Sequence, residues 1–309
     1  MTALAVCAVR ARVGGRWIRL GACAATLAVL VWQLGTGPFL DGLRAVDGGA
    51  LALASGLALL TTVCCAWRWR IVARGLGVDL PLGAAVAAYY RSIFLNLTLP
   101  GGVAGDVHRG FAHGRATDDL GRALRAVAWE RSAGQAVQVV LTVAVLLVAP
   151  SPVRGAMPLV LLALLAAAAG VALTARARPV ARLRGAVVRD VRAVLARRAW
   201  AAIAVASALV VAGHVATFLV AARVAGADVP PWELLPLALL VLLGAALPAV
   251  GGWGPREGVT AWAFAAAGLG ASRGVATAVA YGVMVLVASL PGAAVLLAGW
   301  ARGNGGLRA

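Results

Sequence analysis

Long apolar stretches recur along the whole chain and are separated by short polar segments rich in arginine. An α-helix needs roughly 20 apolar residues to cross a bilayer. Seven stretches approach that length: residues 20–35, 48–67, 127–149, 157–175, 200–222, 232–250 and 275–300. Such repetition is incompatible with one soluble core. It predicts an all-α polytopic transmembrane helix bundle, formed as a single domain over residues 1–309.

Composition agrees with the hydropathy pattern. Hydrophobic residues make up 62% of the chain, mean hydropathy is +0.92 and 13% of residues are charged, against about a quarter in soluble domains. The 28 basic residues are all arginine, and the net charge is +17. These arginines lie between the apolar stretches, where the positive-inside bias places them. We therefore expect anionic membrane lipids as partners and no nucleic acid.

The distribution of arginine also predicts a topology in the cell membrane. If residues 82–99 formed a full span, the segment 176–198, with eight arginines and one aspartate, would fall outside the cell. The positive-inside bias is restored if residues 82–99 dip into the membrane and return to the cytoplasmic side as a re-entrant element. Residues 68–81 are then a cytoplasmic loop. The predicted topology has six full spans and two broken elements, with both termini in the cytoplasm.

The first broken element covers residues 91–110. Proline cannot donate a backbone hydrogen bond and glycine frees the chain from helical dihedrals, so a helix should stop here at membrane depth. Asp106 and Arg109 are three residues apart, close enough to pair if a helix resumes. Arg91 and Asn96 are polar residues within the same element. The residues that break the helix are Pro100, Gly101, Gly102 and Gly105.

The second broken element, residues 247–258, repeats this design. Each contains a Leu-Pro pair, and each places charges of both signs, here Arg256 and Glu257, just before a glycine ten residues after the proline. It is either a re-entrant hairpin or two short spans. Paired broken helices are typical of inverted-repeat transporters with a midplane site, whereas the alternative is two ordinary interfacial loops. The residues that break this helix are Pro248, Gly251, Gly252 and Gly254.

A polar stripe marks the span 127–149. Glu130 and Arg131 open it, and Gln135, Gln138 and Thr142 continue at helical spacing. Lipid would not tolerate the stripe, so it should face the bundle interior, either joining helices or lining a cavity. His214 is isolated in an apolar span and is either a packing residue or a proton relay. Residues 118–125 are expected to form a separate cytoplasmic helix, with Asp118 and Asp119 at its N-terminus.

At these residues the chain resembles the lysylphosphatidylglycerol synthase transmembrane-region family, also called flippase-like integral membrane proteins. The resemblance rests on both broken motifs and on Glu130-Arg131, in the family's order, and covers roughly residues 50–298. It implies a bundle of about eight helices, related to the flippase region of multiple peptide resistance factor, which moves aminoacylated phosphatidylglycerol to the outer leaflet. Other members are linked to polyprenyl-phosphate sugar pathways. The chain to Ala309 contains no soluble transferase domain, so we do not expect synthase activity.

The leading hypothesis is a translocase (flippase) for a phospholipid or polyprenyl-phosphate-type lipid with a phosphate-bearing headgroup. The alternatives are a membrane-embedded glycosyl- or lipid-modifying transferase with Asp106 or Glu257 as base, and a non-catalytic partner of a separately encoded synthase or glycosyltransferase. No cofactor, metal site or catalytic residue is expected, because no such motif occurs. The candidate substrate-binding residues are Arg91, Asn96, Asp106, Arg109, Glu130, Arg131, Arg256 and Glu257.

Overall fold

The computed structural model describes residues 24–99, 102–148, 184–195, 199–245 and 253–305, together with Gly155 and Leu162. Within these ranges the elements are all helices joined by short turns, with no strand, which confirms the all-α prediction. Pro100, Gly101, Pro248, Gly251 and Gly252 lie outside the described residues, as does most of the predicted span 157–175.

Among the described residues, four helices are long and apolar enough to cross a membrane. They are α3 (Gly48–Gly75), α6 (Leu120–Val148), α10 (Ala199–Val224) and the continuous stretch Ala271–Ala301. Each corresponds to one of the six predicted full spans. Of the predicted span 20–35, the described part is the short helix Ala24–Leu34.

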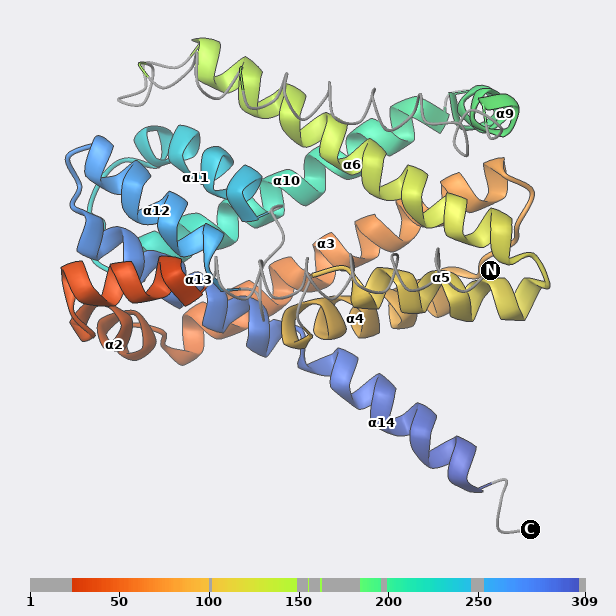
Figure 1. The fold of residues 1–309 in the computed structure, drawn as a ribbon, viewed down its shortest axis with the longest axis horizontal. Coiled ribbons are helices and arrows are strands. Elements are labelled where there is room, and N and C mark those ends of the chain that lie inside the picture. Colours follow the sequence, from red (N-terminus) through yellow and green to blue (C-terminus); the bar gives the residue numbers. More distant parts are fainter. Residues whose placement is uncertain are drawn as a thin grey trace, which may run out of the picture.

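Shorter helices connect the long ones (Figure 1). Each broken element separates a pair of short helices. The first pair is α4 (Leu82–Thr98) and α5 (Ala104–Thr117), and the second is α11 (Pro231–Ala245) and α12 (Pro255–Ala266). Their 17, 14, 15 and 12 residues are each too few to cross the hydrocarbon core, about 30 Å thick, at 1.5 Å per residue. The remaining short helices are α2 (Gly37–Arg44) and α9 (Arg184–Leu195).

The two helix pairs lie at opposite ends of the long axis of the molecule (Figure 1). Between them, α3 packs against α10. The two helices approach closely at Gly213, where an added Cβ would collide with the side chain of Thr61. Chain order within each half is the same: a long helix, a broken pair and a second long helix.

The turns that precede the two broken pairs share a motif that the sequence reading did not identify. Arg74 at the end of α3 pairs with Asp79 at 3.4 Å, and Arg223 at the end of α10 pairs with Asp228 at 2.8 Å. Between the two charges, each turn has a glycine with positive φ, Gly77 (79°) or Gly226 (80°). Equivalent positions in the two halves therefore have the same local structure.

Two sequence-based expectations about element boundaries are wrong. Residues 118–125 do not form a separate helix: Asp118 ends α5 in the left-handed conformation, and α6 runs without interruption from Leu120 to Val148. Residues 68–81 are not wholly a loop, because α3 continues to Gly75 and buries Arg68. The predicted last span, residues 275–300, lies within the apolar helical stretch Ala271–Ala301. This stretch is divided at Ser289 into α13 (Ala271–Ala288) and α14 (Leu290–Gly305), and α14 projects from the bundle (Figure 1).

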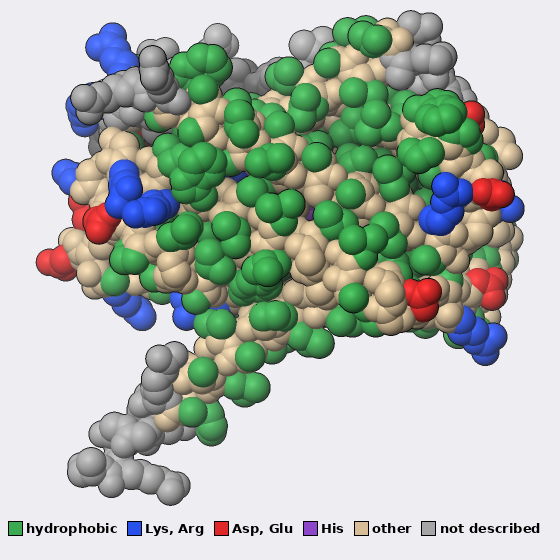
Figure 2. Space-filling model, turned by 180° about the vertical axis from the view of Figure 1, so that it is seen from behind, with side chains coloured by type: hydrophobic (Ala, Val, Ile, Leu, Met, Phe, Trp, Pro, Cys, Tyr) green, Lys and Arg blue, Asp and Glu red, His purple; other side chains and the backbone are tan. Residues whose placement is uncertain are grey.

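The surface has the distribution expected of a protein embedded in a membrane. Figure 2 shows hydrophobic side chains across the middle of the face in view, whereas the charged ones gather toward its two ends. Large apolar residues are exposed on the long helices, including Leu53, Val140 and Val205, each more than half exposed. Lipid would cover such residues in a bilayer, and the protein is a multi-pass membrane protein.

Candidate functional site

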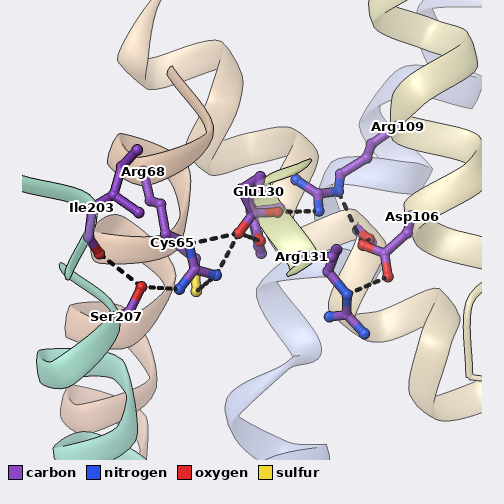
Figure 3. Close-up of polar contacts among 10 residues, drawn as sticks. Cys65, Arg68, Asp106, Arg109, Glu130, Arg131, Ile203 and Ser207 are labelled. Atoms are coloured by element: carbon purple, nitrogen blue, oxygen red, sulfur yellow. Dashed lines mark hydrogen bonds and ion pairs between the residues drawn. The ribbon is translucent and has the colours of Figure 1, made fainter. Parts of the chain in front are cut away.

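Glu130 lies at the centre of a buried network that joins four helices (Figure 3). Its carboxylate, on α6, is fully buried. It accepts hydrogen bonds from both Nε (2.9 Å) and Nη2 of Arg68 on α3, from Tyr89 Oη on α4 (2.7 Å) and from Arg109 Nη2 on α5 (2.7 Å). A buried carboxylate is tolerated only with such partners. Glu130 therefore fixes how α3, α4 and α5 meet α6.

Asp106 is the second acid of this network. Its carboxylate accepts hydrogen bonds from Ser92 Oγ (3.1 Å), Asn96 Nδ2 (3.1 Å) and Arg109 Nε (3.0 Å), and Arg131 Nε lies 3.4 Å away. The pairing of Asp106 with Arg109, predicted from their spacing, is confirmed. Arg109 thus bridges the two acids (Figure 3).

The first helix break brings α5 against α4. The backbone N–H of Gly105 donates to Asn96 Oδ1 at 2.7 Å, and a Cβ at Gly105 would collide with the backbone of Ser92. The guanidinium of Arg109 then lies 4.1 Å from the ring centre of Tyr89 and 4.7 Å from that of Trp69. Glycine is needed at 105 because of this close approach.

The charges of the network do not cancel. Arg68, Arg109 and Arg131 face only two carboxylates, Asp106 and Glu130, so one positive charge remains. The side chains of Arg68 and Arg109 are 6% and 0% exposed, whereas that of Arg131 is 49% exposed. The excess positive charge is therefore accessible at Arg131.

The second broken element holds a smaller cluster of similar design. Glu257 is fully buried, and it accepts hydrogen bonds from Arg256 Nε (3.0 Å) and from the backbone N–H of Gly254 (2.7 Å). Arg256 lies over two aromatic rings, Trp253 at 5.7 Å and Tyr281 at 5.5 Å. Like Arg109, it combines a buried acid with a tryptophan and a tyrosine.

A cavity of about 390 Å³ lies between the two clusters. Arg131, Gln135 and Gln138 line it, so this part of the polar stripe is cavity lining, whereas Thr142 is buried and donates to the carbonyl of Gln138. The other polar residues that line it are Thr61, Thr62, Cys65, Arg68, Tyr89, Ser207, His214 and Tyr281.

Arg68, Tyr89 and Tyr281 are the site residues that sequence reasoning missed. Arg68 was assigned to a cytoplasmic loop, and the two tyrosines lie in apolar stretches without a local signal. Arg68 also donates from Nη1 to Ser207 on α10 at 2.9 Å, which links the network to a fifth helix (Figure 3). The sequence held one usable signal for Arg68. This arginine lies between Trp67 and Trp69, so the membrane helix could continue past Trp67 and place Arg68 inside the bundle.

A family model described as the lysylphosphatidylglycerol synthase TM region matches residues 16–292. The match covers both clusters and the cavity between them. The chain belongs to this family. Searches of curated proteins and of solved structures find no match.

In this lysylphosphatidylglycerol synthase TM region protein, the eight candidate residues fall into three groups. Asn96, Asp106, Arg109, Glu130 and Arg131 come together in the first network, and Arg256 pairs with Glu257 in the second cluster. Arg91, on α4, is partly buried and forms no ion pair with a described residue.

Proposed function

We propose that this protein is a translocase that moves a lipid with a phosphate-bearing headgroup across the cell membrane. The observation that carries the proposal is the cavity between the two clusters, called the central cavity below. There Arg131 presents the uncompensated positive charge of the network around Glu130 and Asp106. Its volume of about 390 Å³ is within the range of roughly 300–1,000 Å³ typical of small-molecule sites. The planar guanidinium group of arginine matches the geometry and charge of a phosphate.

The cavity chemistry suits a headgroup whose acyl chains stay in the lipid. Arg68 and Arg131 would contact the phosphate, and Gln135 and Gln138 would replace hydrogen bonds that the headgroup makes to water. Arg109 and Arg256 are buried in their own clusters, and we assign them to positioning the cavity walls instead of contacting lipid. Asp106 and Glu130 keep most of the positive charge balanced while the cavity is empty.

We further propose that the two halves form an inverted repeat. In this arrangement α4–α5 and α11–α12 are re-entrant hairpins that enter from opposite faces, with both termini cytoplasmic. The turn before α4 and the turn after α5 line one shared pocket, with Asp79 from the first turn and Thr117 and Asp119 from the second. The α4–α5 hairpin therefore begins and ends at the same end of the molecule. The matching Arg–Asp turns and the opposite positions of the hairpins support the repeat.

Leaflet exchange in vesicles tests the proposed function. The purified protein is reconstituted with fluorescent phosphatidylglycerol or a fluorescent polyprenyl phosphate, and lipid left accessible to an external quencher is followed over time. Arg131→Gln should slow exchange about tenfold or more, because a charge-assisted hydrogen bond contributes about 1.5–3 kcal/mol. Wild-type exchange no faster than in protein-free vesicles, for either lipid, would refute the proposal.

Arg122→Gln is the matched control. Arg122 also lies on α6, is 51% exposed and pairs with an acid, Asp119, at 3.2 Å, but it does not line the central cavity. Exchange should stay near the wild-type rate. Equal slowing by both variants would show that loss of any charge on α6 is harmful and would remove the argument for Arg131.

The transferase alternative has weaker structural support. Both candidate bases are engaged by cations: Asp106 accepts from Arg109, and Glu257 accepts from Arg256. A carboxylate held in this way has its oxygens occupied by charge-assisted hydrogen bonds and does not point freely at a substrate. We therefore assign these acids to charge balance.

A further inference from the structure

We propose that His214 binds a proton together with the anionic headgroup, so that lipid movement through the central cavity is coupled to proton movement. This inference rests on the proposed translocase function and adds a source of energy to it. Ionisable residues inside a membrane are costly and usually functional. His214 is the one histidine among the described residues that lines the central cavity.

His214 lies where the two halves of the molecule meet. It follows Gly213, where α10 packs closely against α3, and its Nδ1 lies 3.3 Å from Tyr281 Oη on α13. The ring of Tyr281 in turn lies under Arg256. His214 is thus connected to the second cluster through one hydroxyl group and faces the cavity beside the first network.

A second, smaller cavity of about 50 Å³ adjoins the first, and His214, Thr61 and Thr62 line both. Three hydroxyl groups at its wall, on Thr61, Thr217 and Ser289, donate to carbonyls of their own helices, which leaves their oxygens free to accept. The volume is enough for a few water molecules at about 10–15 Å³ each. Water and hydroxyl oxygens there would connect His214 to a proton path that continues beyond the headgroup cavity.

The groups around His214 explain why a proton and an anion would bind together. Among the described residues, no carboxylate lines either cavity. In the empty protein the nearby arginines therefore oppose a positive charge on the imidazole, and a phosphate in the cavity removes that opposition. Titratable groups from four other helices face His214: Cys65 and Arg68 on α3, Tyr89 and Tyr90 on α4, Arg131 on α6 and Tyr281 on α13. Arg256 on α12 lies beyond Tyr281. The residues of α11 that line the cavity, Leu242 and Ala245, are apolar.

The coupled step is balanced in protons and charge. In the neutral state Tyr281 Oη donates to Nδ1 of His214, and Nε2 carries the imidazole proton. Uptake of one proton at Nδ1 makes this nitrogen a donor and turns the Tyr281 oxygen into an acceptor. One negative headgroup charge and one proton enter together, so the net charge of the cavity is unchanged. By linkage, each increases the affinity for the other by the same factor.

The pH dependence of exchange tests this coupling in vesicles buffered at the same pH on both sides. For wild-type protein and phosphatidylglycerol, the rate should fall as the pH rises, by up to about tenfold per pH unit once the histidine no longer takes up its proton. His214→Gln keeps a hydrogen-bonding side chain without the titration, and its rate should not change over that range. His108→Gln is the matched control, because His108 is exposed on α5 and lines neither cavity.

Each outcome separates this inference from the proposed function. Exchange by the wild type with the same pH profile in His214→Gln would refute proton coupling and leave the translocase intact. No exchange at any pH would refute the translocase itself.

A second measurement does not depend on the variant folding. A pH-sensitive dye trapped in vesicles with wild-type protein should report proton movement when phosphatidylglycerol is supplied on one side, and none with zwitterionic phosphatidylcholine. Equal signals from the two lipids would refute the coupling. Tyr281→Phe removes the hydroxyl but keeps the ring under Arg256, and it should shift the midpoint of the pH profile without abolishing exchange.

Discussion

Single side chains in this protein carry very different energetic weight, and Glu130 carries the most. It is the carboxylate shared by Arg68 and Arg109, which are both almost completely buried. Removing one partner of a buried ion pair leaves a charge without compensation, which costs much more than the pair contributes. By contrast, the pair Arg74–Asp79 lies in solvent-exposed positions.

This difference predicts the effect of two isosteric changes. Glu130→Gln should destabilise the protein by about 3–5 kcal/mol, because two buried guanidinium groups lose their counterion. Asp79→Asn should cost about 0–1 kcal/mol, as for other exposed pairs. Thermal unfolding in detergent measures both. Similar melting temperatures for the two variants would contradict the central role of Glu130.

The residue scale also shows which contacts the sequence could predict. Asp106 and Arg109 are three residues apart on one helix, so their pairing follows from helix geometry. Arg68 and Glu130 are 62 residues apart, and their contact depends on how α3 and α6 pack. No local pattern encodes that packing, which is why Arg68 was assigned to a loop.

At the scale of elements, the helix break between α4 and α5 acts through close packing. The predicted role of the glycines was to release the chain from helical dihedrals. Gly102 does so, with φ of 67°. Gly105, however, is the second residue of α5, and its importance is the absence of a side chain where α5 meets the backbone of α4.

Two glycine-to-alanine changes separate these roles. Gly105→Ala should destabilise the protein by about 1–3 kcal/mol, the usual cost of overpacking, because the collision is with backbone. Gly83→Ala, in α4, meets no atom within 4 Å and should be neutral or stabilising by up to about 1 kcal/mol. Chemical denaturation in mixed micelles would measure both values. A stable Gly105→Ala protein would contradict the packing of α5 on α4.

The elements predicted least well were those bounded by charged residues. Asp118 and Asp119 were expected to start a separate cytoplasmic helix, since acids favour helix N-termini. Asp119 does receive the backbone N–H of Arg122 at 2.9 Å, but the helix that it caps is α6 itself. A capping signal marks where a helix begins and says nothing of where it ends, so the 29-residue length of α6 was missed.

On the scale of the whole molecule, the proposed inverted repeat has a direct consequence for orientation. Asp79 and Asp228 occupy equivalent exposed turns, with side chains 78% and 96% exposed. If the halves are inverted, these turns lie on opposite sides of the membrane.

Site-directed labelling tests this arrangement. In a chain whose four native cysteines are replaced by serine, Asp79→Cys should react with an impermeant thiol reagent only after the cytoplasmic face is exposed, and Asp228→Cys should react from outside. Cell permeabilisation and a mass-shift reagent distinguish the two cases. Labelling of both from the same side would rule out the inverted repeat.

The sequence by itself determined the membrane class, four of the long helices, the two broken elements, the pair Asp106–Arg109 and the inward direction of the polar stripe. All of these follow from hydrophobicity and helix geometry over a few turns. The tertiary structure alone decided that Glu130 joins Arg68 to Arg109, that Arg131 rather than Arg109 faces the cavity, and that Tyr281 links His214 to Arg256. These contacts join residues far apart in the chain, and only helix packing brings them within hydrogen-bonding distance.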